Sequence, residues 1–182
     1  MEVGPTTHYA MGGVRVDGDS QMSCVPGLFA AGECAAGLHG ANRLGGNSLS
    51  DLLVFGKRAG EFAAAFAKEH GAVTLDDRHV DAAANTALAP LERQSASPNG
   101  EGPYQIQYAL QDMMQDLVGI VRNQADMLRA VDGIKKLRER ADRVVALGNR
   151  EYNPGWHTAL DLDNLLIVSE AIVLAGIERN ES

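Results

Sequence analysis

The sequence lacks the features of a nucleic-acid-binding or membrane-spanning protein. Its 24 acidic side chains outnumber its 16 basic ones, which gives a formal net charge of −8, whereas phosphate backbones require clustered positive charge. No apolar run reaches the roughly 20 residues of a membrane-spanning helix, and no signal-peptide pattern opens the sequence. We therefore expect no nucleic-acid partner, no direct membrane span and a cytoplasmic location.

Cysteine and dinucleotide-binding motifs are scarce as well. Cys24 and Cys34 form no CxxC or zinc-ligand pattern, so we interpret them as small buried thiols in a reducing compartment and predict no metal site. No Gly-x-Gly-x-x-Gly follows a predicted strand, and that motif positions the pyrophosphate of a dinucleotide. The pyrophosphate-binding βαβ unit is therefore absent from this sequence.

What the sequence does contain is apolar residues, 45% of the total, enough for a sizeable core. In residues 104–182 they recur at helical spacing in three stretches, which indicates a small bundle of amphipathic helices. The segment 149–156, with Pro154 and Gly155, separates the last two stretches. Before the bundle, residues 94–103 (QSASPNGEGP) are small and turn-forming, so we predict a linker there and a first domain over residues 1–93.

The first domain has a different pattern. Leu28–Ala31 is typical of a short buried strand, and the alternation around Val14 and Val16 indicates a half-exposed partner strand. A glycine-rich loop follows, and then a long helix that opens at Asn47-Ser48, with either residue as its N-cap, and ends at Gly71. The predicted fold class is α+β, mostly α: a short β-hairpin or strand, a glycine-rich loop and a helix, followed by a helical bundle.

The loop before this helix could bind an anion or could simply turn the chain. A helix N-terminus behind glycines presents free N–H groups and a positive dipole end, which suit a phosphate, a carboxylate or an electron-rich ring. Arg43 lies inside the glycine-rich loop, so it is not part of the polar face of an amphipathic helix. Its planar guanidinium can donate two hydrogen bonds to a carboxylate. His8, taken alone, is more typical of a structural histidine.

Two motifs carry a family resemblance. The runs THYAMGGVRVD and GLFAAGECAAGLHGANRLGGNSLSDLLVFGKRAGE resemble the flavoprotein subunit of succinate dehydrogenase and fumarate reductase. Only the later part of such a subunit is matched, so the chain is identified as a fragment: the C-terminal portion of an FAD-binding domain and a helical domain that is incomplete at its C-terminus. The family's proton-transferring arginine lies outside this part, so no catalytic acid or base is assigned here.

The resemblance implies FAD as cofactor, a dicarboxylate (succinate or fumarate) as substrate and hydride transfer between the two. It also implies an iron–sulfur partner subunit, with any membrane contact at the inner face through partner subunits, and an isolated chain that is inactive. His39 is expected to shape the loop. The implied substrate-binding residues are His8 and Arg43, and the implied cofactor-binding residues are Glu33, Asn47, Ser48 and Leu49.

Two other interpretations remain open at this point. The chain could derive from L-aspartate oxidase or a soluble fumarate reductase of the same flavoprotein group, or it could be a non-catalytic helical interaction module. Because the strand and first helix would have packed on the missing half, we also expect an exposed apolar patch on them and a tendency to self-associate.

Overall fold

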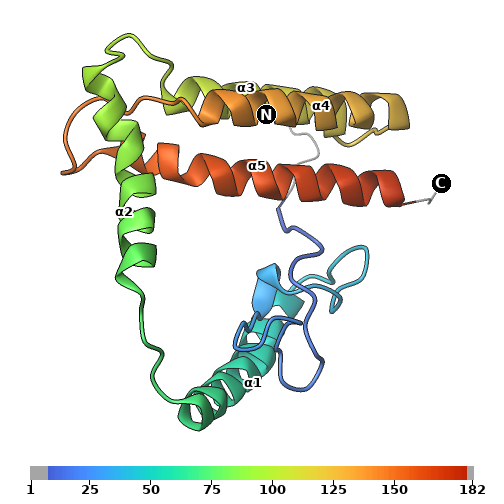
Figure 1. Cartoon of the computed structure of the whole chain (residues 1–182). Coiled ribbons are helices and arrows are strands. Elements are labelled where there is room, and N and C mark those ends of the chain that lie inside the picture. The colour runs from blue at the N-terminus through green and yellow to red at the C-terminus, as the bar shows by residue number, and fades with distance from the viewer. Residues whose placement is uncertain (1–7, 180–182) are drawn as a thin grey trace. The chain divides into compact units, whose positions relative to one another are not determined.

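The computed structural model describes residues 8–179, and its chain divides into two compact units, Met1–Thr74 and Leu75–Ser182. Helices account for most of the regular structure, with one long helix in the first unit and four α-helices among the described residues of the second (Figure 1), which confirms the mostly helical fold class. In the described residues, the expected hairpin is reduced to isolated β-bridges. Each unit is considered separately below.

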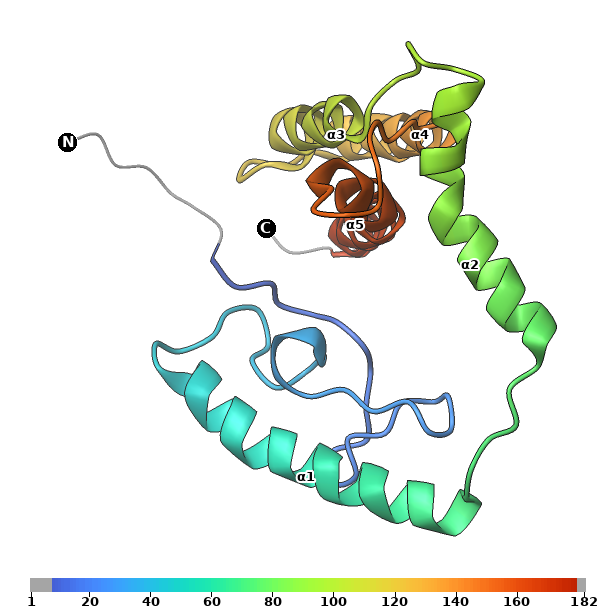
Figure 2. The same cartoon turned by 90° about the vertical axis from the view of Figure 1, so that its left-hand side faces the viewer.

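The first unit consists of loops laid along one side of a single long helix, α1 (Asn47–His70), as Figure 2 shows. The predicted strand at 28–31 does not extend: Phe29 makes one antiparallel bridge with Met22, and the chain then enters the short 3-10 helix η1 (Gly32–Cys34). A ladder cannot lengthen here because turns follow directly on both sides of these bridges.

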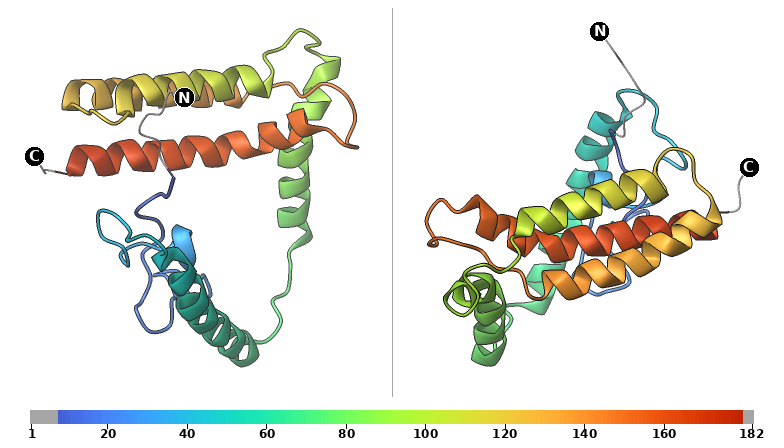
Figure 3. Two further views of the ribbon diagram at one scale, coloured as in Figure 1. Left: turned by 180° about the vertical axis from the view of Figure 1, so that it is seen from behind. Right: turned by 90° about the horizontal axis from the view of Figure 1, so that it is seen from above.

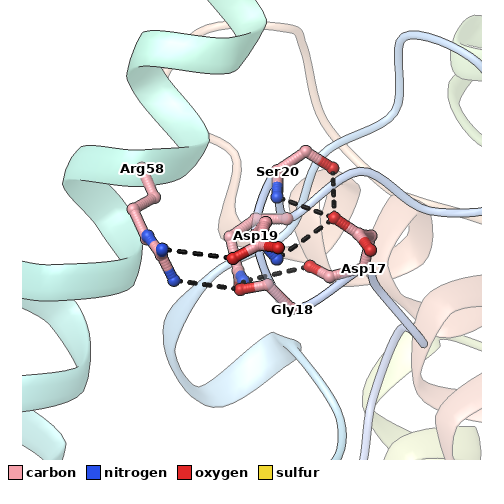
Figure 4. Close-up of polar contacts among 6 residues, drawn as sticks. Asp17, Gly18, Asp19, Ser20 and Arg58 are labelled. Atoms are coloured by element: carbon pink, nitrogen blue, oxygen red, sulfur yellow. Dashed lines mark hydrogen bonds and ion pairs between the residues drawn. The ribbon is translucent and has the colours of Figure 1, made fainter.

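A tight turn fastens these loops to α1 (Figure 4). The Asp17 carboxylate accepts hydrogen bonds from the backbone N–H groups of Asp19 (3.1 Å) and Ser20 (2.8 Å) and from the Ser20 hydroxyl (2.9 Å). These bonds favour the ionised form and lower the pKa of Asp17. From α1, Arg58 donates to the Gly18 carbonyl (3.1 Å) and to the Asp19 carboxylate (3.3 Å). The turn is thus held by polar contacts rather than by an apolar core.

The surface of α1 is unusually apolar. Asp51 is the one residue of this helix classed as buried, while several large apolar side chains remain exposed, with Leu53 at 76% and Leu49 at 67%. These exposures agree with the expected apolar patch. At its C-terminus, as predicted, the helix ends at Gly71, whose N–H bonds to the Ala67 carbonyl at 3.0 Å.

The second unit has four α-helices and its own core. They are α2 (Asp77–Glu92), α3 (Pro103–Val118), α4 (Gln124–Ala141) and α5 (Pro154–Glu178), with a short 3-10 helix η2 (Arg93–Ser95) after α2. Figures 2 and 3 show α3, α4 and α5 side by side, and α2 crossing the end of this layer near the start of α5. The apolar faces meet between the three long helices, as the sequence periodicity predicts. The core residues with at most 1% exposure include Ile106, Ala130, Ile134, Leu162, Leu166 and Val173.

The division between the units differs from the predicted one, since residues 94–103 lie within the second unit. The preceding helix α2 is fixed to this unit by long-range hydrogen bonds. The Trp156 indole N–H donates to the Ala87 carbonyl (2.7 Å), and the Ala146 N–H donates to the Pro90 carbonyl (2.8 Å). Composition marks residues 94–103 as turn-forming. It cannot reveal that the preceding helix, α2, packs against residues that come later in the sequence.

Three further observations concern ligands and surroundings. Cys24 and Cys34 are exposed free thiols, so the prediction that they are buried is wrong. Among residues 8–179, no three His, Cys, Asp or Glu side chains group as metal ligands. Within the same residues, every helix is too short or too polar to span a bilayer.

Candidate functional site

Four side chains gather where the segment around residue 9, the glycine-rich loop and the first turns of α1 meet. We call Tyr9, His39, Arg43 and Asp51 the Tyr9 cluster. The Arg43 guanidinium carbon lies 4.6 Å from the centroid of the Tyr9 ring, and the His39 ring meets that ring edge-on at 5.7 Å. His39 Nε2 is 3.3 Å from Asp51 Oδ2. The cluster therefore joins three segments that are separate in the sequence.

Arg43, a predicted substrate-binding residue, is half-buried and mostly unengaged. Its Nη1 donates to the adjacent Leu44 carbonyl at 3.3 Å, while its Nε is buried with no hydrogen-bond partner in the part of the chain that the structure describes. Buried donors are nearly always satisfied, and a guanidinium carries five N–H donors in a planar fork. The arrangement leaves Arg43 able to donate hydrogen bonds to a planar anion such as a carboxylate.

His8, the second predicted substrate-binding residue, is exposed and lies on the same aromatic ring. The His8 and Tyr9 rings are perpendicular, with centroids 6.5 Å apart. His8, which precedes Tyr9 in the sequence, and Arg43 thus each contact the Tyr9 ring. Sequence reasoning took Tyr9 only as part of a motif, and its ring proves to be the common contact of both predicted substrate-binding residues.

The electrostatic setting of Tyr9 is negative. Its hydroxyl oxygen is buried without a hydrogen-bond partner among the described residues. Burial raises the pKa of this phenol, and the nearby carboxylates of Asp51 and Glu33 raise it further, while Arg43 opposes them. Tyr9 is therefore a neutral aromatic surface for the Arg43 cation at physiological pH.

Glu33, a predicted cofactor-binding residue, ties the motif segment to η1. Its Oε1 accepts a hydrogen bond from the Ala10 N–H at 2.8 Å. The same two segments are joined by the Val14 N–H, which donates to the Cys34 carbonyl at 2.8 Å. The Glu33 side chain remains exposed, so its predicted contact with FAD stays a prediction that the structure leaves room for.

The N-cap prediction for the first long helix is wrong. Gly46 occupies the cap position in the left-handed conformation (φ 85°), and no side chain caps the helix. Glycine adopts this conformation at little cost, which lets the loop turn sharply into Asn47, whose N–H bonds to the Leu44 carbonyl at 3.2 Å. An uncapped helix start carries the positive end of the helix dipole. This fits the predicted cofactor role of Asn47, Ser48 and Leu49 toward an electron-rich ring.

The first unit has a very small cavity beside Tyr9 and a larger one beside Asp51. The hollow lined by Tyr9, Glu33 and His39 holds only about 10 Å³, roughly the space of one water. A larger cavity of about 350 Å³ lies between the turn around Gly18, the glycine-rich loop and α1, with Asp51 in its wall. A dicarboxylate would therefore need additional surfaces to enclose it at the Tyr9 cluster.

Comparisons with known proteins match both halves of the chain. A family model described as an FAD binding domain matches residues 1–49, the range that holds all six predicted site residues, and one described as fumarate reductase flavoprotein C-term matches residues 107–182. The fumarate reductase flavoprotein subunit of Haemophilus influenzae is 42% identical over 182 residues, which cover 99% of this chain and 30% of that protein. The succinate dehydrogenase flavoprotein subunit of Coxiella burnetii is 37% identical, covering 98% of this chain and 32% of that protein.

A solved structure gives the same result at the level of the fold. The Mycobacterium smegmatis Sdh1 complex in the apo form aligns with a TM-score of 0.92 and 48% sequence identity, over 100% of this chain and 30% of that one. The chain spans about 30% of the length of the curated relatives it matches. Along its whole length the chain is thus similar to about 30% of the flavoprotein subunits of fumarate reductases and succinate dehydrogenases.

Proposed function

We propose that this chain supplies the carboxylate clamp and part of the flavin-binding surface of a flavoprotein that interconverts succinate and fumarate. The observation that carries the proposal is Arg43, whose guanidinium lies on the Tyr9 ring and keeps a buried Nε with no partner among the described residues. A planar cation held in this way is suited to a carboxylate of the substrate.

In this proposal, Arg43 and His8 bind one end of the dicarboxylate. Arg43 contributes paired N–H donors, and the exposed His8 adds a further hydrogen bond. Fixing one carboxylate limits the positions that the adjacent carbon can take, which is catalysis by orientation. No residue of this chain is proposed as the acid or base of the reaction.

The flavin side of the site is proposed to be the start of α1 together with Glu33. FAD supplies the hydride acceptor or donor when it is bound. Asn47, Ser48 and Leu49 present the uncapped helix terminus, whose dipole favours negative charge nearby. The Glu33 carboxylate can accept hydrogen bonds from sugar hydroxyls. We assign the first unit to the later part of the FAD-binding domain, and the bundle α3–α5 to the helical domain.

The remaining parts of the reaction lie in the proposal outside this chain. We propose an iron–sulfur partner subunit as the electron carrier and membrane contact, at the inner face, through partner subunits. The isolated chain is expected to lack turnover, because the pyrophosphate-binding unit and the acid/base residue are not within it. The preferred direction of reaction is left open by every residue discussed above.

A hybrid subunit tests the proposal. This chain would replace the matching segment of the Haemophilus influenzae relative, and fumarate reduction and succinate oxidation would be measured with soluble dyes. Arg43→Lys should lower kcat/KM at least about 100-fold, because an ammonium cannot reproduce the bidentate geometry. Arg78→Lys is the matched control, since Arg78 is 89% exposed in the second unit. An active hybrid whose KM and kcat are unchanged by Arg43→Lys would contradict the clamp.

Flavin binding by the 182-residue chain itself is a second, simpler measurement. Quenching of FAD fluorescence and the visible spectrum would be followed as chain is added. We expect weak or no binding, since only part of the flavin surface is present. Tight binding with a spectrum that bleaches on adding succinate would show that the chain needs no further segment. That result would contradict the proposal that this chain supplies only part of the flavin-binding surface.

A further inference from the structure

We propose that Asp51 is a positioning residue that fixes the Arg43 guanidinium through His39 and Tyr9. The consequence for turnover rests on the proposed function of Arg43, whereas the structural part of the inference does not. None of the three supporting residues was predicted to contact substrate or cofactor.

The burial of Asp51 is the first reason. Asp51 is the one residue of α1 classed as buried, and its side chain is only 4% exposed. Its neighbours in the helix, Leu52 and Leu53, are 53% and 76% exposed. Burying a carboxylate is costly unless it is paired and hydrogen-bonded, so a buried acid on a helix with an exposed apolar surface calls for a partner.

The partner is His39, and this contact continues to Arg43. His39 Nε2 lies 3.3 Å from Asp51 Oδ2, and the His39 side chain is 13% exposed. The His39 ring stands edge-on to Tyr9 at an interplanar angle of 83°. Arg43 lies against the same Tyr9 ring, 4.6 Å from its centroid. Each contact limits the orientation of the next side chain.

The geometry explains why such support is needed. In the described part of the chain, Arg43 has a single hydrogen bond, to the carbonyl of the next residue, which does not define the plane of the guanidinium. Cation–π contact depends on the ring face, so fixing the Tyr9 ring fixes where the guanidinium can lie. The glycine-rich loop that carries Arg43 and His39 has few other anchors, and Asp51 belongs to the regular helix beneath it. A rigid element thereby holds a residue on a loop.

Nuclear magnetic resonance of the full chain tests the structural part directly. The Nε–Hε signal of Arg43, identified by its disappearance in Arg43→Lys, should be displaced by the Tyr9 ring current. Asp51→Ala should return that signal toward the position of a solvated arginine, whereas Asp51→Asn should keep it displaced, because an amide oxygen still accepts from His39. Glu61→Ala is the matched control, since Glu61 lies on the same helix with a 63% exposed side chain.

A second variant keeps the test decisive if Asp51→Ala disrupts the unit. His39→Gln retains a donor for Asp51 but removes the ring that meets Tyr9. It should also return the Arg43 signal toward the solvated position, while the backbone amide spectrum of the unit is preserved. An Arg43 signal that stays displaced in His39→Gln, or in a folded Asp51→Ala chain, would overturn the inference.

The hybrid subunit then measures the consequence for the substrate. Asp51→Ala should raise the KM for fumarate about tenfold with a smaller change in kcat, the factor expected when a charge-assisted contact is weakened, and Asp51→Asn should recover most of it. The two failures are distinguishable. If Arg43→Lys leaves the hybrid's kinetics unchanged, the proposed carboxylate clamp is refuted, and the role of Asp51 is still tested by the Arg43 Nε–Hε signal. An unmoved Arg43 signal would refute the role of Asp51 and leave the clamp intact.

Discussion

The two units of this chain are stabilised in different ways. The second unit buries apolar residues from α3, α4 and α5, with Ile106, Ile134 and Leu166 fully enclosed. The first unit has a single large helix, in which only the acidic Asp51 is classed as buried, and its loops are held by hydrogen bonds and ring contacts. The second unit therefore has its own apolar core. The first unit instead leaves the apolar side chains of α1 exposed.

This difference bears on where the site lies. All six predicted site residues are in the first unit, where polar contacts such as Glu33 to Ala10 (2.8 Å) fix the backbone. Functional elements are commonly drawn from the less stable parts of a protein. We therefore expect the second unit, which has an apolar core, to be the more stable of the two.

The largest expected effect is a core truncation in the second unit. Leu166→Ala removes a side chain with 0% exposure and should lower the free energy of unfolding by about 3 kcal/mol, within the range for buried leucines. Leu53→Ala, on the 76% exposed Leu53 of α1, should change it by less than about 0.5 kcal/mol. Urea denaturation, followed by Trp156 fluorescence and by circular dichroism, would measure both. Equal effects of the two truncations would contradict the contrast between the units.

A local clash should disturb the first unit while leaving the second intact. At Gly13 (φ 123°) an added Cβ would lie 2.3 Å from the Cys34 carbonyl oxygen, so Gly13→Ala must displace the segment that carries His8 and Tyr9. The strain is of the order of 2 kcal/mol. Hydrogen exchange of the Val14 and Ala36 amides, which bond across this junction, should accelerate about 30-fold.

The control for this clash is Gly18→Ala, because nothing lies within 4 Å of a Cβ added there. Its exchange rates at Val14 and Ala36 should match those of the unaltered chain. The amides of the bundle should be unaffected by either substitution. Faster exchange in α4 of the Gly13→Ala chain would contradict the independence of the two compact units.

The sequence predicts the helical part of this fold well, because periodicity reports local structure. The long helix ending at Gly71 and the three bundle helices are confirmed. The strand at 28–31 and the cap at Asn47 or Ser48 are not, since both depend on where neighbouring segments turn. The division after Thr74 differs from the predicted boundary at residues 94–103 for the same reason: the hydrogen bond from Trp156 to Ala87 joins residues 69 positions apart.

The site was predictable only in part. His8, Glu33 and Arg43 could be named from the family motifs as predicted site residues, and His8 and Arg43 each contact the Tyr9 ring. Tyr9 and Asp51 were missed because their roles depend on contacts across three segments. On α1 Asp51 lies on the side opposite Leu49, Leu52 and Leu53, where helical periodicity predicts a solvated acid. Its burial beside His39 could therefore be found only from the structure.

A smaller effect is expected where polar contacts join α1 to the turn at residues 17–20. Arg58→Gln removes the ion pair with Asp19, whose side chain is 87% exposed, so the loss of stability should be about 0.5 kcal/mol or less. The substitution should nonetheless loosen the turn locally. The amide of Ser20, which bonds to Asp17, would exchange faster. Lys57→Gln, with its 73% exposed side chain, is the adjacent control and should leave that amide unchanged.

The smallest effect is a pH dependence confined to the second unit. Arg140 Nε donates to Glu101 Oε2 at 3.1 Å, and Arg140 also bonds the other carboxylate oxygen. These hydrogen bonds lower the pKa of Glu101 below its ordinary value. The stabilisation is therefore fully present above the unfolded pKa of about 4.3 and is lost as the pH falls through the lower folded pKa. Because the pair is about one-third exposed, solvent screening limits the stabilisation to roughly 0.3 kcal/mol.

Glu101→Gln isolates this contribution, since glutamine keeps the side-chain length and removes the charge. The difference in unfolding free energy between the unaltered chain and Glu101→Gln should be greatest near pH 7. It should shrink below about pH 4, as protonation makes the glutamate neutral as well. Glu139→Gln, an exposed site one residue before Arg140 in α4, is the control and should show no such convergence. A difference that stayed constant from pH 7 to pH 3 would mean that Glu101 stabilises the bundle through packing rather than through its charge.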